Sequence, residues 1–213
     1  MEYIKRPMDI EKRSMEIIEE ELGDKLKDIP EEILPVVKRA IHTTADFDFA
    51  EIIDYSDDFI KGVEAGLKAG SPLITDTTMS LSGINKRVLK SLGVDYHCLI
   101  SDPEVVEKAK IDGTTRSMAA VRVTFQRFEK PIFVIGNAPT ALFQLKELID
   151  KENLRPAAII GVPVGFVGAR ESKEEIRKVD LPYLVTRGRK GGSTVAASIV
   201  NALLYQMASN ITP

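Results

Sequence analysis

The chain has 213 residues, of which 44% are hydrophobic, so it can bury the core of one full domain, whereas two domains would each be small. Its formal net charge of −3 excludes the broad basic surface that would attract nucleic acid or an anionic membrane. The single cysteine, Cys98, excludes an internal disulfide. Because Cys98 lies in an apolar run, we expect a buried thiol, as in a protein of the reducing cytoplasm.

The sequence also carries no sign of export or membrane insertion. Residues 1–7 lack the apolar segment of a secretory signal, and no window approaches the roughly 18 consecutive apolar residues of a spanning helix. We therefore expect a cytoplasmic protein with no membrane and no nucleic-acid partner.

Residues 9–70 are rich in charge and have the apolar spacing of helices. A first helix is predicted over residues 10–22, with Asp9 as its N-cap and Gly23 closing it. A second is predicted over residues 31–42, with Pro35 in its first turns. A third is predicted over residues 57–68, before Gly70.

From residue 72 onward, short apolar runs alternate with helical stretches. Five strands are predicted, at Pro72–Thr75, Tyr96–Ile100, Ile132–Ile135, Ala157–Gly161 and Tyr183–Val185. Because the runs are apolar throughout, both faces of the sheet should be covered, as in a mostly parallel α/β sheet. We predict one α/β domain over 1–213, with the helical segment of about 1–70 packed on it.

The loops that follow these strands are rich in small and polar residues. The loops begin at Thr75, Ile135, Gly161 and Thr186, and the last contains Gly191. In parallel sheets ligands gather at the carboxyl ends of the strands, and exposed N–H groups there favour anions. The Gly188–Thr194 stretch is not a true P-loop, and no GxGxxG follows the first predicted strand. Tight turns account for some of these glycines but poorly explain four such loops at once.

A second candidate feature is the pair formed by Arg39 and His42. Three residues apart on a helix, they lie on one face, so a fork of cationic donors sits beside a side chain that exchanges protons near neutral pH. This pairing suits a site that binds carboxylates and moves one proton. The alternative is a histidine that only caps or packs the helix end.

The sequence gives little support for metal, nucleophile or glycoside chemistry. Two histidines and one cysteine give no zinc-ligand spacing, and no GxSxG elbow is present. His97 falls in a predicted apolar strand, which favours a hydrogen-bonded core residue. Asp46 and Asp48 could pair as two carboxylates, but the absence of tryptophan gives glycoside chemistry little support. We expect no metal site and no cofactor.

The sequence resembles the precorrin-8X methylmutase family of cobalamin biosynthesis from about Tyr3 to Ala208. The resemblance rests on five segments that occur in order: Arg39 with HTTAD (42–46), GTTRS (113–117), GNAPTAL (136–142), GVPVGFVGARESK (161–173) and GRKGGS (188–193). The third and fourth are highly specific. Residues 207–213 lie outside the pattern.

This resemblance implies a flavodoxin-like three-layer fold and a homodimer with its substrate near the subunit interface. It also implies an isomerase that moves a methyl group from carbon 11 to carbon 12 of a corrin precursor, giving hydrogenobyrinate or, with cobalt, cobyrinate. The catalytic residue of the family falls on His42, and its substrate contacts fall on Ser14 and Arg39, with Arg116 matching the GTTRS motif.

We add Thr75 and Gly191 as candidate substrate contacts because their loops should present donors to the acidic arms of the ring. Arg116 could instead pair with Asp112 or Glu129. Two alternative functions stay open: a corrinoid carrier without catalysis, which would not need His42, and a nucleotide-dependent methyltransferase, against which the missing GxGxxG weighs.

Overall fold

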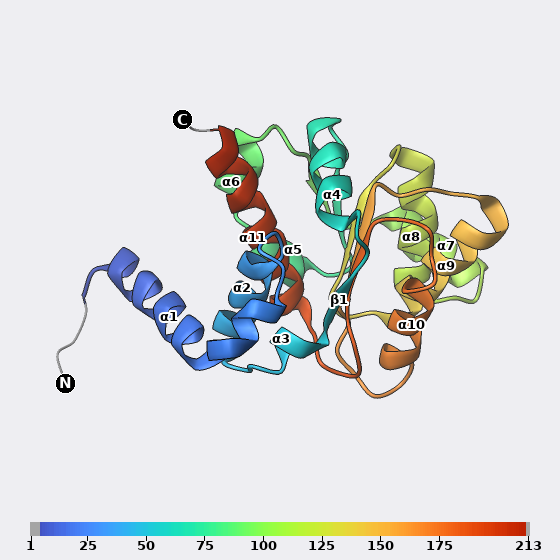
Figure 1. Ribbon diagram of the computed structural model, residues 1–213. Helices are drawn as coiled ribbons and strands as arrows, with labels where there is room; N and C mark the ends of the chain where they lie inside the picture. Colours follow the sequence, from blue (N-terminus) through green and yellow to red (C-terminus); the bar gives the residue numbers. More distant parts are fainter. Residues whose placement is uncertain (1–4, 212–213) are drawn as a thin grey trace.

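The computed structural model describes residues 5–211. Residues 1–4 and 212–213 lie outside the described part. Tyr3, where the family resemblance begins, and both ends of the predicted domain are among them. Within the described residues the chain forms a mixed α/β fold around one sheet, with helices on both sides (Figure 1).

Six strands make up the sheet in the described part. They are β1 Ile53–Tyr55, β2 Leu73–Thr75, β3 Tyr96–His97, β4 Ile132–Ile135, β5 Ala158–Gly161 and β6 Tyr183–Thr186. Their spatial order is β1-β6-β5-β4-β2-β3, and every neighbouring pair is parallel except β1 with β6. Without β1, the parallel strands follow the order 2-1-3-4-5, which is that of flavodoxin-like folds.

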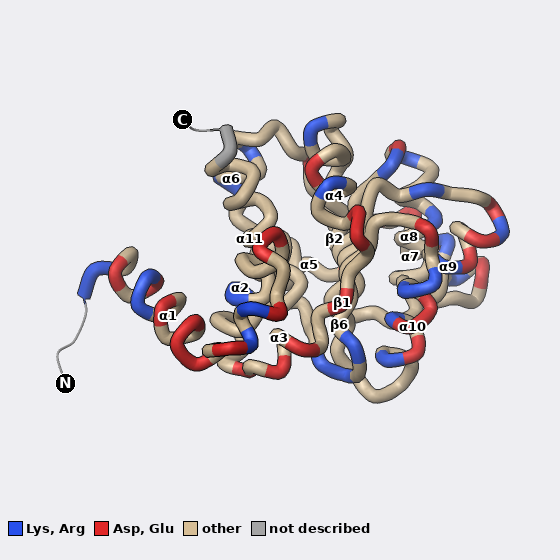
Figure 2. The backbone as a smooth tube through the Cα atoms, viewed as in Figure 1, with Lys and Arg blue, Asp and Glu red and all other residues tan. Residues whose placement is uncertain are grey.

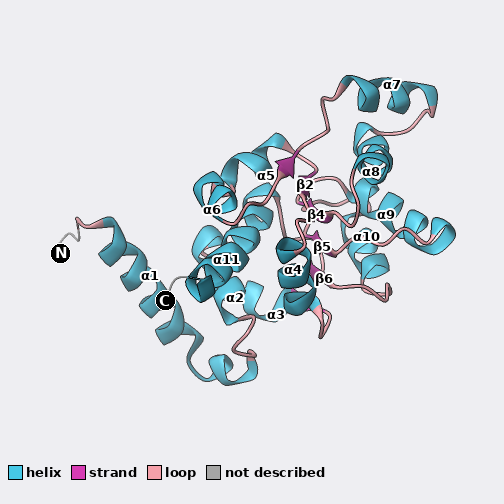
Figure 3. Ribbon diagram, turned by 90° about the horizontal axis from the view of Figure 1, so that it is seen from above, coloured by secondary structure: helices cyan, strands magenta, loops and turns pink. Residues whose placement is uncertain are grey.

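One face of the sheet carries four helices. They are α4 Phe59–Lys68, α5 Thr78–Gly83, α6 Lys86–Ser91 and α11 Ser193–Ile211. Helix α5 packs on α11 and β2, and the other three share a hydrophobic core with strands of the sheet. The other face carries α8 Arg116–Arg127, α9 Pro139–Glu152 and α10 Ala169–Ile176, with α7 Pro103–Ile111 packed against α8 (Figure 3). The predicted three-layer arrangement is confirmed.

The N-terminal elements are α1 Pro7–Leu22, the 3-10 helix η1 Gly23–Asp28, α2 Leu34–Thr44 and α3 Phe49–Ile52. Helix α2 packs along α11, while α1 packs mainly on α2 and η1 and projects away from the sheet (Figure 1). The groove described in the next section lies along α11, between α2 and α5.

The strands are buried on both faces, as their composition predicts. In β4, Ile132 and Val134 face the core of α4 and α11, whereas Phe133 and Ile135 face the core of α9 and α10. Neither face of this strand reaches solvent, which explains why apolar runs rather than an alternating pattern mark it in the sequence.

Two strand predictions were wrong. Five strands were expected, but Ile53–Tyr55 adds a short antiparallel edge strand whose residues are only half buried, so its pattern is weak. The predicted strand Tyr96–Ile100 ends at His97, because β3 is an edge strand with a single parallel neighbour, β2. Cys98 is accordingly half buried rather than buried, and His97 is half buried and stacked on Phe128 at 4.7 Å.

The predicted helices are all present, with shifted ends. The first begins at Pro7 with Arg6 as N-cap, not Asp9, because proline fixes the helical φ at the first position. The second begins at Leu34, with Pro35 in its first turn, and ends where Ala45 adopts a left-handed φ of 53°. Among the residues that the structure describes, no helix is long and apolar enough to cross a membrane.

Candidate active site

A groove of about 290 Å³ runs along the outer side of α11, between α2 and α5. Its lining comprises Arg39, His42, Thr43, Met79, Gly83, Thr194, Ala197, Ser198, Asn201 and Tyr205. The structure thus places the predicted pair Arg39 and His42 on the wall of a cavity.

Helix α2 presents this pair because its opposite side is buried. Val36, Val37, Ala40 and Ile41 form the face that packs into the core, which leaves Arg39 and His42 one turn apart beside the groove. His42 is exposed and lies in the last turn of α2. An exposed imidazole beside a cavity can exchange a proton with a ligand there.

The floor of the groove is made of small, uncharged side chains of α11. Thr194, Ala197, Ser198 and Asn201 follow one another at helical spacing, and α11 carries no charged residue, so its tube is tan in Figure 2. Gly83 allows α5 to pack closely, because a Cβ at that position would lie 2.8 Å from the Cβ of Ala197. A flat ligand could lie against such a floor without a steric barrier.

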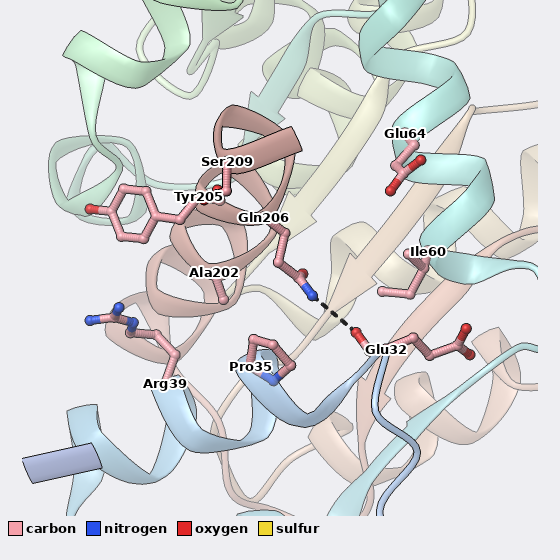
Figure 4. A pocket seen from close by; sticks show the side chains of 9 residues that line it. All are labelled: Glu32, Pro35, Arg39, Ile60, Glu64, Ala202, Tyr205, Gln206 and Ser209. Atoms are coloured by element: carbon pink, nitrogen blue, oxygen red, sulfur yellow. Dashed lines mark hydrogen bonds between the residues drawn. The ribbon is translucent and has the colours of Figure 1, made fainter. Parts of the chain in front are cut away.

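Charge separates this groove from a larger cavity nearby. The groove is lined by Arg39 and His42 and by no carboxylate. A cavity of about 450 Å³ between α2, α4 and α11 has two carboxylates, Glu32 and Glu64, in its lining (Figure 4). Arg39 lines both spaces, so its positive charge stands alone in the groove and is outnumbered by the two carboxylates in the larger cavity. A ligand that carries several carboxylates is therefore favoured in the groove over the larger cavity.

Arg39 is held from two sides. Its Nη1 lies 2.7 Å from Oε1 of Glu11 on α1, and its guanidinium carbon lies 5.4 Å from the centre of the Tyr205 ring. The Arg39 side chain is only 23% exposed, so the guanidinium has a defined position at the groove.

Ser14 lies one helical turn beyond Glu11 on α1 and is half buried. Its hydroxyl donates to the carbonyl oxygen of Ile10 at 2.8 Å. The spacing puts Ser14 on the same side of α1 as the Glu11–Arg39 contact, but the residue is not among those that line the groove.

Thr75 lies away from the groove. It is buried, and its hydroxyl donates to the carbonyl oxygen of Thr77 at 3.0 Å. The next residue, Asp76, accepts the backbone N–H groups of Gly136, Asn137 and Ala138 at 3.0, 2.8 and 2.7 Å. We expected the N–H groups of this small-residue loop to bind a ligand, but a carboxylate of the chain itself already uses them.

Gly191 lies just before α11, and its role is one of close packing. It has a φ of 151°, and a Cβ there would lie 2.1 Å from the carbonyl oxygen of Val162. The same oxygen accepts the N–H of Gly192 at 2.8 Å. The loop before α11 and the loop after β5 are therefore joined backbone to backbone, and the join fixes where α11 begins.

Lys190 ties this loop to the end of α2. Its Nζ lies 2.5 Å from Asp46 and 2.6 Å from Asp48, the two residues that we considered as a carboxylate pair. Their partner is thus a lysine of the chain. Lys190 thus binds carboxylates of its own chain and not a phosphate, as the lysine of a P-loop would. These contacts hold in place the segment that follows His42.

Arg116 is the first residue of α8, on the sheet face opposite α11 (Figure 3), and its side chain is exposed. The expected alternative partner Asp112 pairs instead with Lys108 at 3.3 Å. Within one chain, the structure does not bring Arg116 to the groove. Across residues 5–211, no cluster of three or more histidine, cysteine or acidic side chains could hold a metal ion.

Comparison with known proteins decides the family. The family model described as precorrin-8X methylmutase matches residues 9–206. The chain belongs to this family. The cobalt-precorrin-8 methylmutase of Salmonella typhimurium is 47% identical, over 97% of this chain and 99% of that protein.

Two further relatives of this methylmutase family agree over most of their length. The cobalt-precorrin-8 methylmutase of Leptospira interrogans is 44% identical over 92% of this chain and 91% of that one. The crystal structure of the precorrin-8X methylmutase of Thermus thermophilus superposes with a TM-score of 0.88 at 35% identity, covering 95% of this chain and 97% of that one.

Sequence reasoning missed the α11 side of the groove in this methylmutase-family chain. Thr194, Ser198, Asn201 and Tyr205 follow a spacing of four, three and four residues within a mostly apolar helix, which is one polar stripe. That stripe was visible in the sequence, but it signals a site only once α2 is known to pack beside α11.

Proposed function

We propose that this chain is a methylmutase that moves a methyl group within a corrin precursor of the precorrin-8 type. One observation carries the proposal: in a chain of this family, a groove without carboxylates presents His42 one turn from Arg39. The activity is that of an isomerase, because no second substrate enters and none leaves.

The proposed step is a methyl shift from carbon 11 to carbon 12 of the ring. The bond from the methyl group to carbon 11 breaks as the bond to carbon 12 forms, and the π electrons of the ring rearrange. His42 donates a proton to a ring nitrogen, which makes the conjugated system more electron-poor and lowers the barrier. It recovers that proton afterwards, so the reaction is balanced without a cosubstrate.

Arg39 supplies the binding contact. Its fork of N–H donors matches a carboxylate, and an acidic arm of the substrate would form a charge-assisted pair with it. We place Ser14 beside this contact on α1. Arg116 lies on the other face of the sheet, so we propose that it reaches an acidic arm of the substrate only from the second subunit of a dimer. For Thr75 and Gly191 we propose an indirect part, in which they shape the loops next to the groove.

We propose the cobalt-containing ring as the natural substrate. The relatives that are 47% and 44% identical are both named cobalt-precorrin-8 methylmutase. The metal belongs to the substrate, and the step above needs no protein ligand to it. Assays of metal-free and cobalt-loaded substrate side by side test this choice, and a higher kcat/KM for the metal-free ring would overturn it.

We further propose a homodimer that acts in the cytoplasm. Helix α1 exposes three large apolar side chains, Met8, Ile10 and Ile17, with exposed fractions of 83%, 43% and 38%. A groove of about 290 Å³ is at the lower limit for enclosing a small ligand, so a broad macrocycle would extend beyond it and need a cover. Light scattering of the purified chain should give twice the monomer mass; a monomer mass at all concentrations would contradict the dimer.

The competing functions are a corrinoid carrier and a nucleotide-dependent methyltransferase. A carrier has no use for a proton-exchanging side chain beside Arg39. For the transferase, the nucleotide fingerprint is missing from the sequence, and Asp76 already fills the N–H groups of the loop before α9.

The deciding experiment mixes purified protein with substrate alone, without any methyl donor or nucleotide. The visible spectrum should change, because the position of the saturated carbon changes, while the mass of the pigment stays constant. A need for an added donor, or a product heavier by one methylene, would establish the transferase instead. Binding without any spectral conversion would establish the carrier.

A further inference from the structure

Tyr205 lies where the groove and the larger cavity meet. Arg39 and Tyr205 line both spaces, and the other lining residues differ. In Figure 4, Arg39 and Tyr205 lie at one end of the larger cavity, and Glu64 lies on α4 at the other. The two side chains therefore form the wall that divides a groove without carboxylates from a cavity that contains two.

The Tyr205 ring is fixed by a short chain of hydrogen bonds. Nδ2 of Asn85 donates to the Tyr205 hydroxyl oxygen at 3.1 Å. The backbone N–H of Asn85 donates to Oδ1 of Asn201 at 2.8 Å, and Nδ2 of Asn201 donates to the carbonyl oxygen of Gly83 at 2.9 Å. Movement of the ring would break the contact with Asn85, so Tyr205 offers a defined surface.

Arg39 uses that surface and keeps its hydrogen-bonding edge available. A guanidinium whose carbon lies 5.4 Å from a ring centre is attracted by the ring face, and its N–H donors can still point elsewhere. One donor is used by Glu11, whose side chain is 51% exposed. An ion pair with such an exposed partner is weak and easily exchanged.

We propose that Tyr205 is the positioning residue of Arg39, and that Glu11 holds the guanidinium until a substrate carboxylate takes its place. The ring keeps the fork of Arg39 at the groove edge and closes the way toward Glu32 and Glu64. The carboxylate arm thus stays on the side of His42. This assignment rests on the proposed function, because it concerns the substrate of the same groove.

A double-mutant cycle tests the assignment. Tyr205→Met keeps most of the side-chain volume and removes the ring face, whereas Tyr205→Phe keeps the face and removes the hydroxyl. The probe is hydrogenobyrinate, the metal-free product, titrated onto the protein and followed by its visible absorption. Tyr205→Met should weaken binding about 5-fold to 20-fold with little change in kcat, and Tyr205→Phe should stay within about 3-fold of wild type.

Repeating Tyr205→Met in a chain that lacks Arg39 distinguishes a positioning role of Tyr205 from a general loss of structure. In an Arg39→Ala chain, Tyr205→Met should add no further loss of affinity, because the group that it positions is gone. An equal loss in both backgrounds, or no loss in the wild-type background, would overturn the proposal. A merely structural role would lower the unfolding midpoint without this coupling.

Glu11→Gln provides the opposite change. Removing the competing carboxylate should tighten binding of the probe by a few-fold at low salt, and the gain should vanish in the Arg39→Ala chain. Weaker binding would contradict the exchange of Glu11 for substrate. If the wild-type chain neither binds nor converts corrinoids, the proposed function itself fails. If the enzyme is active but the losses from Tyr205→Met and Arg39→Ala simply add, only the positioning role fails.

Discussion

The carboxylate of Asp76 accepts the backbone N–H of Ala138 at 2.7 Å, at the point where the order of the parallel strands reverses between β2 and β4. In doubly wound folds this crevice usually receives the ligand. In this chain, Asp76 also accepts the N–H groups of Gly136 and Asn137, so a side chain of the protein fills the place of an anion. The candidate site lies instead along α11, beside α2.

Asp76→Asn should therefore destabilise the fold. The amide keeps one acceptor oxygen but turns two N–H donors toward backbone N–H groups, which leaves at least one buried donor unsatisfied. A loss of about 1–3 kcal/mol is expected. Urea unfolding followed by circular dichroism measures it, with the exposed Asp180→Asn as control. Equal midpoints for both variants would show that the loop does not depend on the carboxylate.

The local sequence pattern was sufficient to predict the buried parallel strands. It was insufficient to predict the edge strand and the contacts of the loops. The apolar run Ile132–Ile135 defines a strand buried on both faces by itself. The edge strand Ile53–Tyr55 depends on pairing with β6, more than 125 positions away along the chain. Its Asp54 is explained only by partners at a similar separation along the chain, Arg177 at 3.0 Å and the Tyr183 hydroxyl at 3.3 Å. Likewise, nothing near GNAPTAL in the sequence indicates that Asp76 would use its N–H groups.

The same distinction applies to the site. Arg39 and His42 are three residues apart on one helix, so their proximity could be predicted. Tyr205 comes more than 160 residues later, and only the packing of α11 on α2 brings it to Arg39.

The buried contacts of Lys173 lead to a prediction about the pH dependence of stability. Lys173 is fully buried in α10, and its Nζ lies 2.9 Å from the carbonyl oxygen of Lys190 and 3.2 Å from the Thr186 hydroxyl. Burial lowers the pKa of Lys173 from its ordinary 10.5 to about 8. Between these two values the unfolded chain keeps a proton that the folded chain has lost, so the free energy of unfolding from this group rises with pH.

Lys173→Met should remove that rise. Across pH 8 to 10.5 the wild type should gain up to about 3 kcal/mol relative to the variant, since each pKa unit is worth about 1.4 kcal/mol. Below pH 8 the difference should be constant. Urea unfolding at several pH values measures it, and the exposed Lys178→Met serves as control. Parallel curves for wild type and Lys173→Met would refute the prediction.

Arg39→Ala should weaken corrinoid binding by about 1.5–3 kcal/mol, because it removes a charge-assisted contact. Arg39→Lys should recover only part of the loss, since an ammonium lacks the planar fork. Titration of hydrogenobyrinate decides this. The matched control is Arg122→Ala, an arginine that also pairs with a glutamate, Glu152 at 3.1 Å, on the opposite face of the sheet. Unchanged affinity in Arg39→Ala would return Arg39 to a purely structural ion pair with Glu11.

His42→Ala should lower kcat by roughly 10²–10⁴-fold and leave hydrogenobyrinate affinity within a few-fold of wild type, because general acid catalysis acts mainly in the transition state. His97→Gln, at the only other histidine, is the control and should keep full turnover, since His97 stacks on Phe128 away from the groove. Because His42 is exposed, added imidazole should reach its place and restore part of the turnover of the alanine variant. Turnover near the wild-type rate in His42→Ala would refute the acid role; a loss of turnover together with a large loss of affinity would make His42 a binding residue.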